Sequence, residues 1–347
     1  MKAHGAASGK VILLGEHLVV YGAPALASGI DRGARAEAEL LPEGSPSELA
    51  LAGEIFRADP DAADKRAQAF ARLLAEGITP PPLRVTAESD LPPGGGLGSS
   101  AALGVAIGRA VNALTHRAQV VPSLALAQGG ASAPDATAGD TLAANTEALR
   151  RAEAWERVFH GRPSGIDTAA AATGGCLRYM RKGGITQMSS VAPGRDLVLC
   201  VGLSGEHAST DAMVAGVARF KDRHPDAFDR TLAGVTSLVE NAALAIEDGD
   251  LPALGKLMDL NQMLLAGLMV STESLEILCS TAREAGALGA KLTGAGGGGA
   301  VIALVGAAEP DPALDQTKAA RVLAAWKEKG FDGFTVRIRK RETAPSP

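Results

Sequence analysis

Two glycine-rich segments, residues 94–100 and 294–299, constrain the fold of this chain more than any other feature of its sequence. The first reads Gly-Gly-Gly-Leu-Gly-Ser-Ser and follows two prolines, and the second reads Gly-Ala-Gly-Gly-Gly-Gly. Because glycine lacks a Cβ, such segments let backbone N–H groups approach a ligand or another backbone closely. From Ala101 onward the apolar residues have helical spacing, and a helix that begins after the first segment favours a phosphate at its N-terminus. A turn with a serine as helix cap is the structural alternative.

Neither segment fits the common nucleotide motifs in its context. A P-loop needs a lysine that neither segment supplies. Both match the spacing G-x-G-x-x-[GA] of a dinucleotide fingerprint, but the first does not directly follow a strand and has no acid about 20 residues later. The second is followed by the strand-like residues 300–305, where that motif requires a helix. The context therefore disfavours an NAD-dependent oxidoreductase.

Composition narrows the class of protein. A length of 347 residues allows two domains, and 46% hydrophobic residues suffice for a core. The net charge of −5 argues against a general nucleic-acid binder. Three widely separated cysteines favour neither a zinc site nor a disulfide framework, which fits a reducing compartment. With no signal-peptide pattern and no run of about 18 apolar residues, we expect a cytoplasmic protein that does not span a membrane.

The hydrophobic patterns predict mixed α and β structure with a domain boundary at residues 192–194. A buried strand at 10–14 is expected to resume at 18–21, residues 119–140 to form a flexible loop, and residues 175–190 a hairpin. Further strands are predicted at 25–41, 83–87, 197–203, 300–305 and 333–338, and helices at 61–76, 101–114, 142–159, 228–247, 251–266, 273–286 and 312–329. The predicted parts are an N-terminal domain at 1–193, a C-terminal domain at 194–340 and a tail at 341–347.

Three segments together resemble the motifs of the GHMP kinase superfamily. Residues 92–102 resemble its central nucleotide loop, residues 291–299 its third motif and residues 9–17 its first, in the expected order over nearly the whole chain. The resemblance implies an α+β fold of two domains. These are an N-terminal ATP-binding domain like ribosomal protein S5 and a C-terminal ferredoxin-like α/β sandwich, with the active site in the cleft between them.

Within the superfamily, two segments are similar to the mevalonate kinases. Residues 15–22 read Gly-Glu-His-Leu-Val-Val-Tyr-Gly, whereas galactokinases usually continue Gly-Glu-His-Thr-Asp-Tyr, and residues 160–167 resemble the segment around the catalytic aspartate of mevalonate kinases. Leu18 and Thr168 depart from the usual Ala and Asn. The resemblance implies phosphorylation of the 5-hydroxyl of (R)-mevalonate to 5-phosphomevalonate, in the mevalonate route to isoprenoids. Another GHMP kinase, acting on phosphomevalonate or a sugar, and a non-catalytic nucleotide-binding regulator are the alternatives.

The resemblance also assigns roles to individual residues. It implies Mg²⁺ as cofactor and mevalonate and ATP as the molecules bound, with Asp167 and Lys10 as catalytic residues. The expected metal ligands are Ser100 and Glu156. The expected ATP-binding residues are Pro93, Gly94, Gly95, Gly96, Leu97, Gly98, Ser99 and Ser100. The expected substrate-binding residues are Lys10, Glu16, His17, Asp167, Thr293, Gly294 and Ala295. The many small apolar residues are compatible with a monomer or a homodimer.

Without the resemblance, plainer interpretations would be preferred. Asp167 follows Ser164 at capping-box spacing before an alanine-rich helix, Lys10 would be a solvated cation at the end of a strand, and His17 a core histidine with a satisfied hydrogen bond.

Glu156 differs from its neighbours in charge pattern. On the predicted helix 142–159, Glu147 and Glu153 each have an arginine four residues later, as in ordinary surface pairs. Glu156 has Ala152 four residues earlier and His160 four residues later, and so lacks such a partner.

Overall fold

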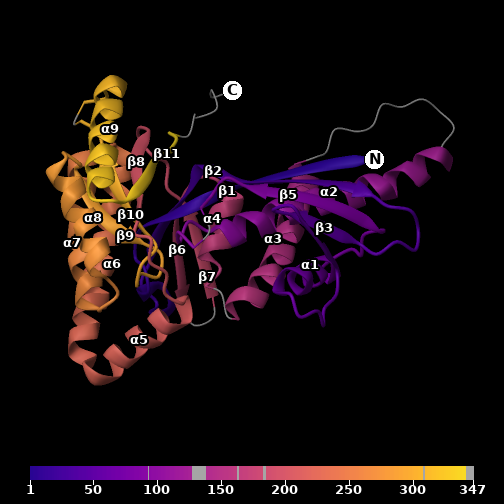
Figure 1. Cartoon of the computed structure of the whole chain (residues 1–347), viewed down its shortest axis with the longest axis horizontal. Helices are drawn as coiled ribbons and strands as arrows, with labels where there is room; N and C mark the ends of the chain where they lie inside the picture. Colours follow the sequence, from indigo (N-terminus) through magenta and orange to yellow (C-terminus); the bar gives the residue numbers. More distant parts are fainter. Residues whose placement is uncertain (93, 127–137, 162–163, 183–184, 308, 341–347) are drawn as a thin grey trace. The chain divides into compact units, whose positions relative to one another are not determined.

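The computed structural model describes residues 1–92, 94–126, 138–161, 164–182, 185–307 and 309–340 (Figure 1). The described chain divides into two compact units that do not follow the order of the sequence. Unit 1 takes its residues from 1–9, 32–91 and 98–172, and unit 2 from 10–31, 92–97 and the chain after 172. The domain boundary predicted at residue 193 stays a prediction.

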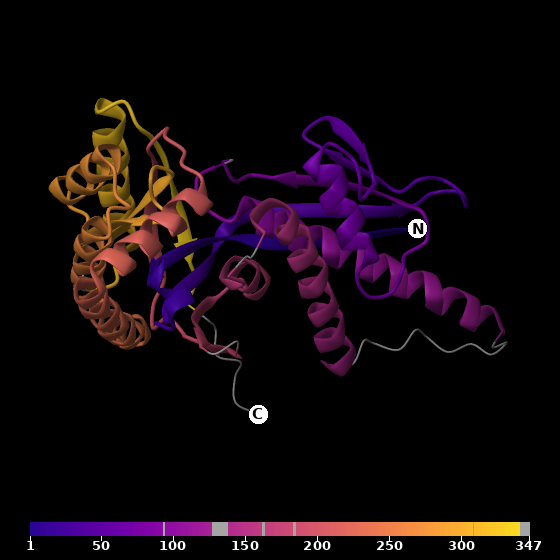
Figure 2. The same ribbon diagram turned by 90° about the horizontal axis from the view of Figure 1, so that it is seen from below.

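Unit 1 combines a β-sheet with packed helices. Helix α2 packs on strand β5, and helices α1 and α3 pack on each other (Figure 1, Figure 2). Strand β2 pairs antiparallel with β5, with Ala36 opposite Ala87, and β3 runs parallel to β5. The elements that lie wholly or partly in this unit are β1 (Lys2–Leu14), β2 (Ala25–Leu40), β3 (Glu48–Leu51), β4 (Glu54–Arg57), α1 (Lys65–Ala75), β5 (Leu83–Ser89), α2 (Ser99–Leu126), α3 (Ala138–His160) and α4 (Ile166–Thr173).

Apolar spacing and a cap explain where α1 forms. The carboxylate of Asp64 accepts a hydrogen bond of 2.7 Å from the backbone N–H of Arg66 and so caps the helix. The predicted apolar face is confirmed, since Phe70, Leu73 and their neighbours are buried.

Two local expectations are wrong. Helix α2 extends to Leu126 and α3 begins at Ala138, so the loop expected at 119–140 is helical at both ends; Gly129, Gly130 and Pro134 lie outside the described residues. Residues 18–21 form a 3₁₀ helix, η1 (Leu18–Tyr21), instead of a strand. The chain leaves the extended conformation there because Gly15 and His17 have φ angles of 97° and 62°.

Unit 2 contains a four-stranded antiparallel sheet in the described chain, with the order β11-β8-β10-β9. Val201 lies opposite Ile302, and Val301 opposite Leu292, on strands whose residues are almost all buried. The main elements are β6 (Cys176–Lys182), β7 (Ile185–Ser190), β8 (Leu197–Leu203), α5 (Thr210–Arg223), α6 (Pro225–Asp248), α7 (Leu251–Gly267), α8 (Glu273–Glu284), β9 (Gly289–Thr293), β10 (Ala300–Val305), α9 (Pro312–Glu328) and β11 (Asp332–Ile338). Strands β6 and β7 form the predicted hairpin, and β6 also pairs with the beginning of β2.

Helices α8 and α9 cover the same face of this sheet. A Cβ at Gly202 of β8 would lie 2.9 Å from Leu278 of α8 and 3.0 Å from the ring of Trp326 of α9. The indole N–H of Trp326 donates to the carbonyl of Leu278 at 2.8 Å. The sequence therefore yields the expected α/β sandwich, although α5 and β9 were not predicted. None of the described helices is long and apolar enough to cross a lipid bilayer.

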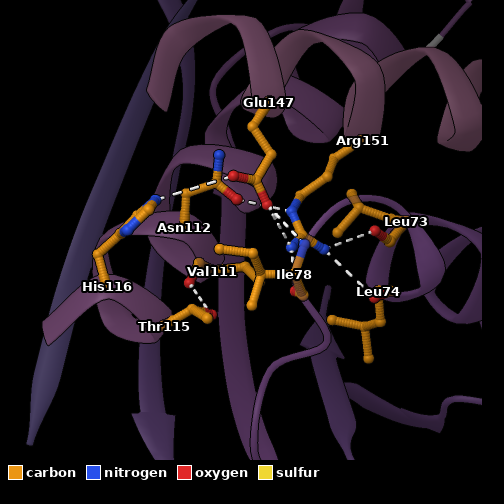
Figure 3. A network of polar contacts seen from close by, with 9 residues as sticks. All are labelled: Leu73, Leu74, Ile78, Val111, Asn112, Thr115, His116, Glu147 and Arg151. Carbon is orange, nitrogen blue, oxygen red and sulfur yellow. Dashed lines mark hydrogen bonds and ion pairs between the residues drawn. The ribbon is translucent and has the colours of Figure 1, made fainter. Parts of the chain in front are cut away.

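A buried arginine ties together three helices of unit 1 (Figure 3). Arg151 of α3 is fully buried and donates to the Asn112 side chain of α2 at 2.6 Å. It also donates to the carbonyl of Leu73 in α1 at 2.9 Å, to the carbonyl of Ile78 at 2.6 Å and to the carboxylate of Glu147 at 2.9 Å. Glu147 and Arg151 therefore do not form the surface ion pair that their spacing suggests. The guanidinium donates to carbonyls at the end of α1, which have no partner inside that helix, and so anchors α3 to α1.

We expect Arg151→Met to lower the free energy of unfolding by about 3–5 kcal/mol, since it leaves the carboxylate of Glu147 without its cation and the carbonyls without the guanidinium donors. The control is Arg157→Met on the same helix. Arg157 lies half exposed, 3.6 Å from Glu153, and its loss should cost less than about 1 kcal/mol. Urea unfolding of both variants checks this, and equal effects would contradict the anchor.

Candidate active site

The two glycine segments touch each other in unit 2, backbone against backbone. A Cβ at Gly96 would lie 3.1 Å from the carbonyl oxygen of Thr293, and one at Gly294 would lie 3.5 Å from the Cα of Gly96. A Cβ at Gly299 would lie 3.8 Å from the carbonyl oxygen of Gly94. Segments about 200 residues apart in the sequence therefore lie directly against each other through their main chains.

Local conformation requires glycine at several of these positions as well. Gly94, Gly96 and Gly98 have φ angles of 73°, 69° and 72°, in the left-handed region that other residues rarely adopt. A Cβ at Gly298 would lie 2.4 Å from the carbonyl oxygen of Glu206. Packing of the protein on itself thus demands part of the glycine content, in addition to any approach of a ligand.

Helix α2 begins at Ser99, directly after the left-handed Gly98. This is two residues before the start that the sequence predicts. The first N–H groups of a helix have no partner inside the helix, and the helix dipole adds partial positive charge there. The first turn of α2 carries no acidic side chain to compete for these groups. The end of the first glycine segment therefore suits an anion such as phosphate. Of the residues expected to bind ATP, Pro93 lies outside the described residues.

Ser100 and Glu156 meet in unit 1. The hydroxyl of Ser100 donates to Glu156 Oε1 at 2.5 Å and accepts a hydrogen bond of 3.2 Å from the indole N–H of Trp155. Glu156 is buried, and its other oxygen lies 3.8 Å from Nε2 of His160. A hydroxyl beside a carboxylate is a set of hard oxygen donors, which fits Mg²⁺. No group of three or more metal-ligating side chains occurs in the described part of the chain, so other oxygens would have to complete the shell.

Lys10 is buried, with 3% of its surface exposed, so the interpretation as a solvated cation is wrong. Its backbone N–H donates to the carbonyl of Leu97 at 2.8 Å, which joins the first motif to the first glycine segment within unit 2. Asp167 lies in unit 1, in the first turn of α4, and is partly exposed. The interaction expected between Lys10 and Asp167 stays a prediction.

Glu16 lies in a buried ion pair that the sequence did not reveal. Its side chain is fully buried, with Oε1 bonded to the Nζ of Lys291 and Oε2 accepting from the Asn261 amide at 3.1 Å. Burial lowers the pKa of Lys291, and the charge of Glu16 opposes that shift. Lys291 occurs in the segment that resembles the third family motif, but no local pattern links Lys291 or Asn261 to Glu16, which lies 275 and 245 residues away from them.

Thr293 and His17 join the first motif to the third. The backbone N–H of Ile12 donates to Thr293 Oγ1 at 2.9 Å, and Nε2 of His17 donates to the carbonyl of Ala295 at 2.7 Å. The hydrogen bond of His17 matches the interpretation as a satisfied core histidine. Unit 2 thus contains the residues expected to bind the substrate apart from Asp167, and two of them, His17 and Ala295, are bonded directly to each other.

Comparison with known proteins gives consistent results. The profile described as GHMP kinases N terminal domain matches residues 65–175, and the profile described as GHMP kinases C terminal matches residues 242–332. The mevalonate kinase of Thermococcus sibiricus is 33% identical over 88% of this chain and 89% of its own length. The mevalonate kinase of Methanothermobacter thermautotrophicus is 34% identical over 87% of this chain and 90% of its own length. The crystal structure of L. major mevalonate kinase in complex with R-mevalonate superposes with a TM-score of 0.77, at 30% identity, over 99% of this chain and 97% of that one.

Gly296→Ala should destabilise the protein by more than about 2 kcal/mol. Gly296 has a φ angle of 71°, and a Cβ there would lie 2.2 Å from the carbonyl oxygen of Val270. Gly267→Ala, where nothing lies within 4 Å of the added Cβ, is the matched control and should change the stability by less than about 1 kcal/mol. Thermal unfolding of both variants measures this, and a harmless Gly296→Ala would refute the packing argument.

Burial lowers the pKa of His17 below its ordinary value of 6.5, against the effect of the bond to Ala295. As the pH falls, His17 is therefore protonated at a higher pH in the unfolded chain than in the folded protein. The stability contributed by neutral His17 is present above pH 6.5 and is lost as the pH falls below it. We expect His17→Asn, which tolerates the positive φ, to show a shallower loss of stability below that pH. Urea midpoints across the range test this, and identical slopes would contradict it.

Proposed function

Since the chain belongs to the mevalonate kinase family of the GHMP kinases, we propose that it transfers the γ-phosphoryl group of ATP to the 5-hydroxyl of (R)-mevalonate, giving 5-phosphomevalonate and ADP. The observation that carries this proposal is about 33% identity to mevalonate kinases over most of both chains. The similarity to the L. major enzyme, whose structure contains R-mevalonate, supports the choice of substrate.

The start of α2 and the segment before it bind the phosphates of ATP in this proposal. Backbone N–H groups of residues 94–100 face the anion, and the left-handed glycines leave no side chains in their way. The absence of an acidic side chain from the first turn of α2 supports this assignment. Pro93 is included on the basis of the family motif.

Ser100 and Glu156 hold Mg²⁺ in this proposal. Bound there, Mg²⁺ would neutralise charge on the β- and γ-phosphates. Their adjacency supports the assignment, because Mg²⁺ commonly takes one or two protein oxygens and completes its shell with phosphates and water.

Asp167 and Lys10 serve the attacking oxygen in this proposal. Asp167 orients the 5-hydroxyl and accepts its proton, and Lys10 offsets the charge of the transferred group. A loose transition state needs little early proton removal, so orientation is the larger part of the role of Asp167. The burial of Lys10 supports its role, because a cation acts more strongly where water is excluded.

The substrate pocket is formed by the first and third motifs in this proposal. Glu16 and Thr293 act largely through the bonds that hold these motifs together, whereas His17, Gly294 and Ala295 present ring and main-chain groups to mevalonate. A cytoplasmic location remains an expectation from the sequence, which is compatible with a monomer or a homodimer.

A coupled assay of ADP release with mevalonate, ATP and Mg²⁺ tests the reaction directly. The panel should include phosphomevalonate and galactose, because phosphomevalonate kinase and galactokinase share this fold. We expect turnover of mevalonate to exceed that of the other alcohols by orders of magnitude. Faster turnover of another alcohol than of mevalonate would show that the proposed substrate is wrong.

Asp167→Asn should reduce turnover by about 10²–10⁴-fold while ATP binding is retained, since the amide can neither accept the proton nor carry the charge. The matched control is Asp226→Asn, the same change in the first turn of the exposed start of α6, which should leave turnover unchanged. Steady-state kinetics and ATP titration measure both effects. Normal turnover in Asp167→Asn would refute the assigned role.

A further inference from the structure

One face of α2 forms a seam with α3 in unit 1. Positions four residues apart on α2 contact α3 in reverse chain order, so the two helices run in opposite directions along the seam. These positions are Ser100 against Glu156, Gly104 against Ala152 and Trp155, Gly108 against Ala148 and Arg151, and Asn112 against Arg151. Polar contacts lie at both ends of the seam, with glycines between them.

The indole of Trp155 is held firmly within this seam. Trp155 is 1% exposed, and its ring lies against that of Phe159 with a centroid distance of 5.4 Å. A Cβ at Gly104 would lie 2.9 Å from Cδ1 of the indole and 3.4 Å from the Cα of Ala152. Gly104 therefore makes the space that the indole fills, one helical turn after Ser100.

Two partners of opposite character fix the hydroxyl of Ser100. The indole N–H of Trp155 can only donate, and a carboxylate such as Glu156 can only accept. The hydroxyl hydrogen must therefore point toward Glu156, while one oxygen lone pair receives the indole N–H. The second lone pair of Ser100 Oγ is used by neither partner, and its direction follows from the other two.

We propose that Trp155 is a positioning residue for the cation site: its indole N–H orients the Ser100 hydroxyl so that a lone pair is presented to Mg²⁺. This inference rests on the proposed function, in which Ser100 and Glu156 are the protein ligands of Mg²⁺. Mg²⁺ demands nearly ideal octahedral geometry, so a hydroxyl held in one orientation binds it better than a freely rotating one.

Trp155→Phe keeps an aromatic ring in the seam but removes the N–H donor. We expect the Mg²⁺ concentration for half-maximal activity to rise about tenfold, as for other groups that orient metal ligands, with little change in KM for mevalonate. Trp326→Phe also removes a buried indole donor, one bonded to the Leu278 carbonyl in unit 2, and should leave the Mg²⁺ requirement unchanged. A wild-type Mg²⁺ requirement in Trp155→Phe would overturn the proposal.

Fluorescence supplies a test that needs neither turnover nor a change at residue 155. The sequence contains two tryptophans, so Trp326→Phe leaves Trp155 as the only one. Titration of this protein with MgCl₂ in the presence of ADP should shift the Trp155 emission, and adding Ser100→Ala should abolish the shift. An emission that does not respond to Mg²⁺ would overturn the proposal, even if Trp155→Phe fails to fold.

The proposed metal site and the proposed role of Trp155 can be refuted separately. If Ser100→Ala and Glu156→Gln raise the Mg²⁺ requirement but Trp155→Phe does not, the role of Trp155 is wrong and the metal site stands. If none of the three variants changes the requirement, the metal assignment in the proposed function is wrong and the role of Trp155 falls with it.

Discussion

Direct contact between two main-chain segments is the constraint on which the rest of unit 2 depends. A Cβ at Gly96 would lie 3.1 Å from the carbonyl oxygen of Thr293, so the third motif would have to shift slightly to admit it, and a Cβ at Gly294 would lie in van der Waals contact with Gly96. This contact permits the short links from Lys10 to Leu97 and from Ile12 to Thr293, which join three motifs that are distant in the sequence. Glycine at position 96 is therefore favoured both by this packing and by its left-handed conformation, whatever ligand the segment binds.

Both units contain buried charged side chains whose polar atoms are satisfied by hydrogen bonds and ion pairs. In unit 1, Arg151 has carbonyls and a carboxylate around its guanidinium; in unit 2, Lys291 and Asn261 take up both oxygens of Glu16. Ion pairs of this kind contribute little net stability compared with apolar packing, but breaking them is costly, so they favour one arrangement over its alternatives. We interpret the pair at Glu16 as a device that holds the first motif in register with the third.

Local sequence patterns predict much of the fold, but they predict few of the hydrogen bonds and ion pairs within the candidate site. Strand β8 was predicted residue by residue, because a continuous apolar run is visible in sequence. The apolar face of helix α1 was visible as well, although the helix begins at Lys65 and not at residue 61. Helix α5 is largely exposed and strand β9 is short with a lysine in it, so neither carries a strong signal. The site residues were named through resemblance to family motifs. Trp155 escaped notice, since an aromatic residue beside Glu156 suggests only core packing.

The sequence by itself determined that a helix follows the first glycine segment, where strands such as β8 and β10 lie, and which residue types are available for phosphate and cation chemistry. These are local properties, set by glycine conformation, helix capping and apolar spacing. Only the tertiary structure decided that Lys291 neutralises Glu16, that Arg151 closes the end of α1 and that Trp155 holds the Ser100 hydroxyl. Such pairings join groups that are 55 to 275 residues apart, and they depend on how whole helices and strands pack, for which no stretch of sequence carries a local signal.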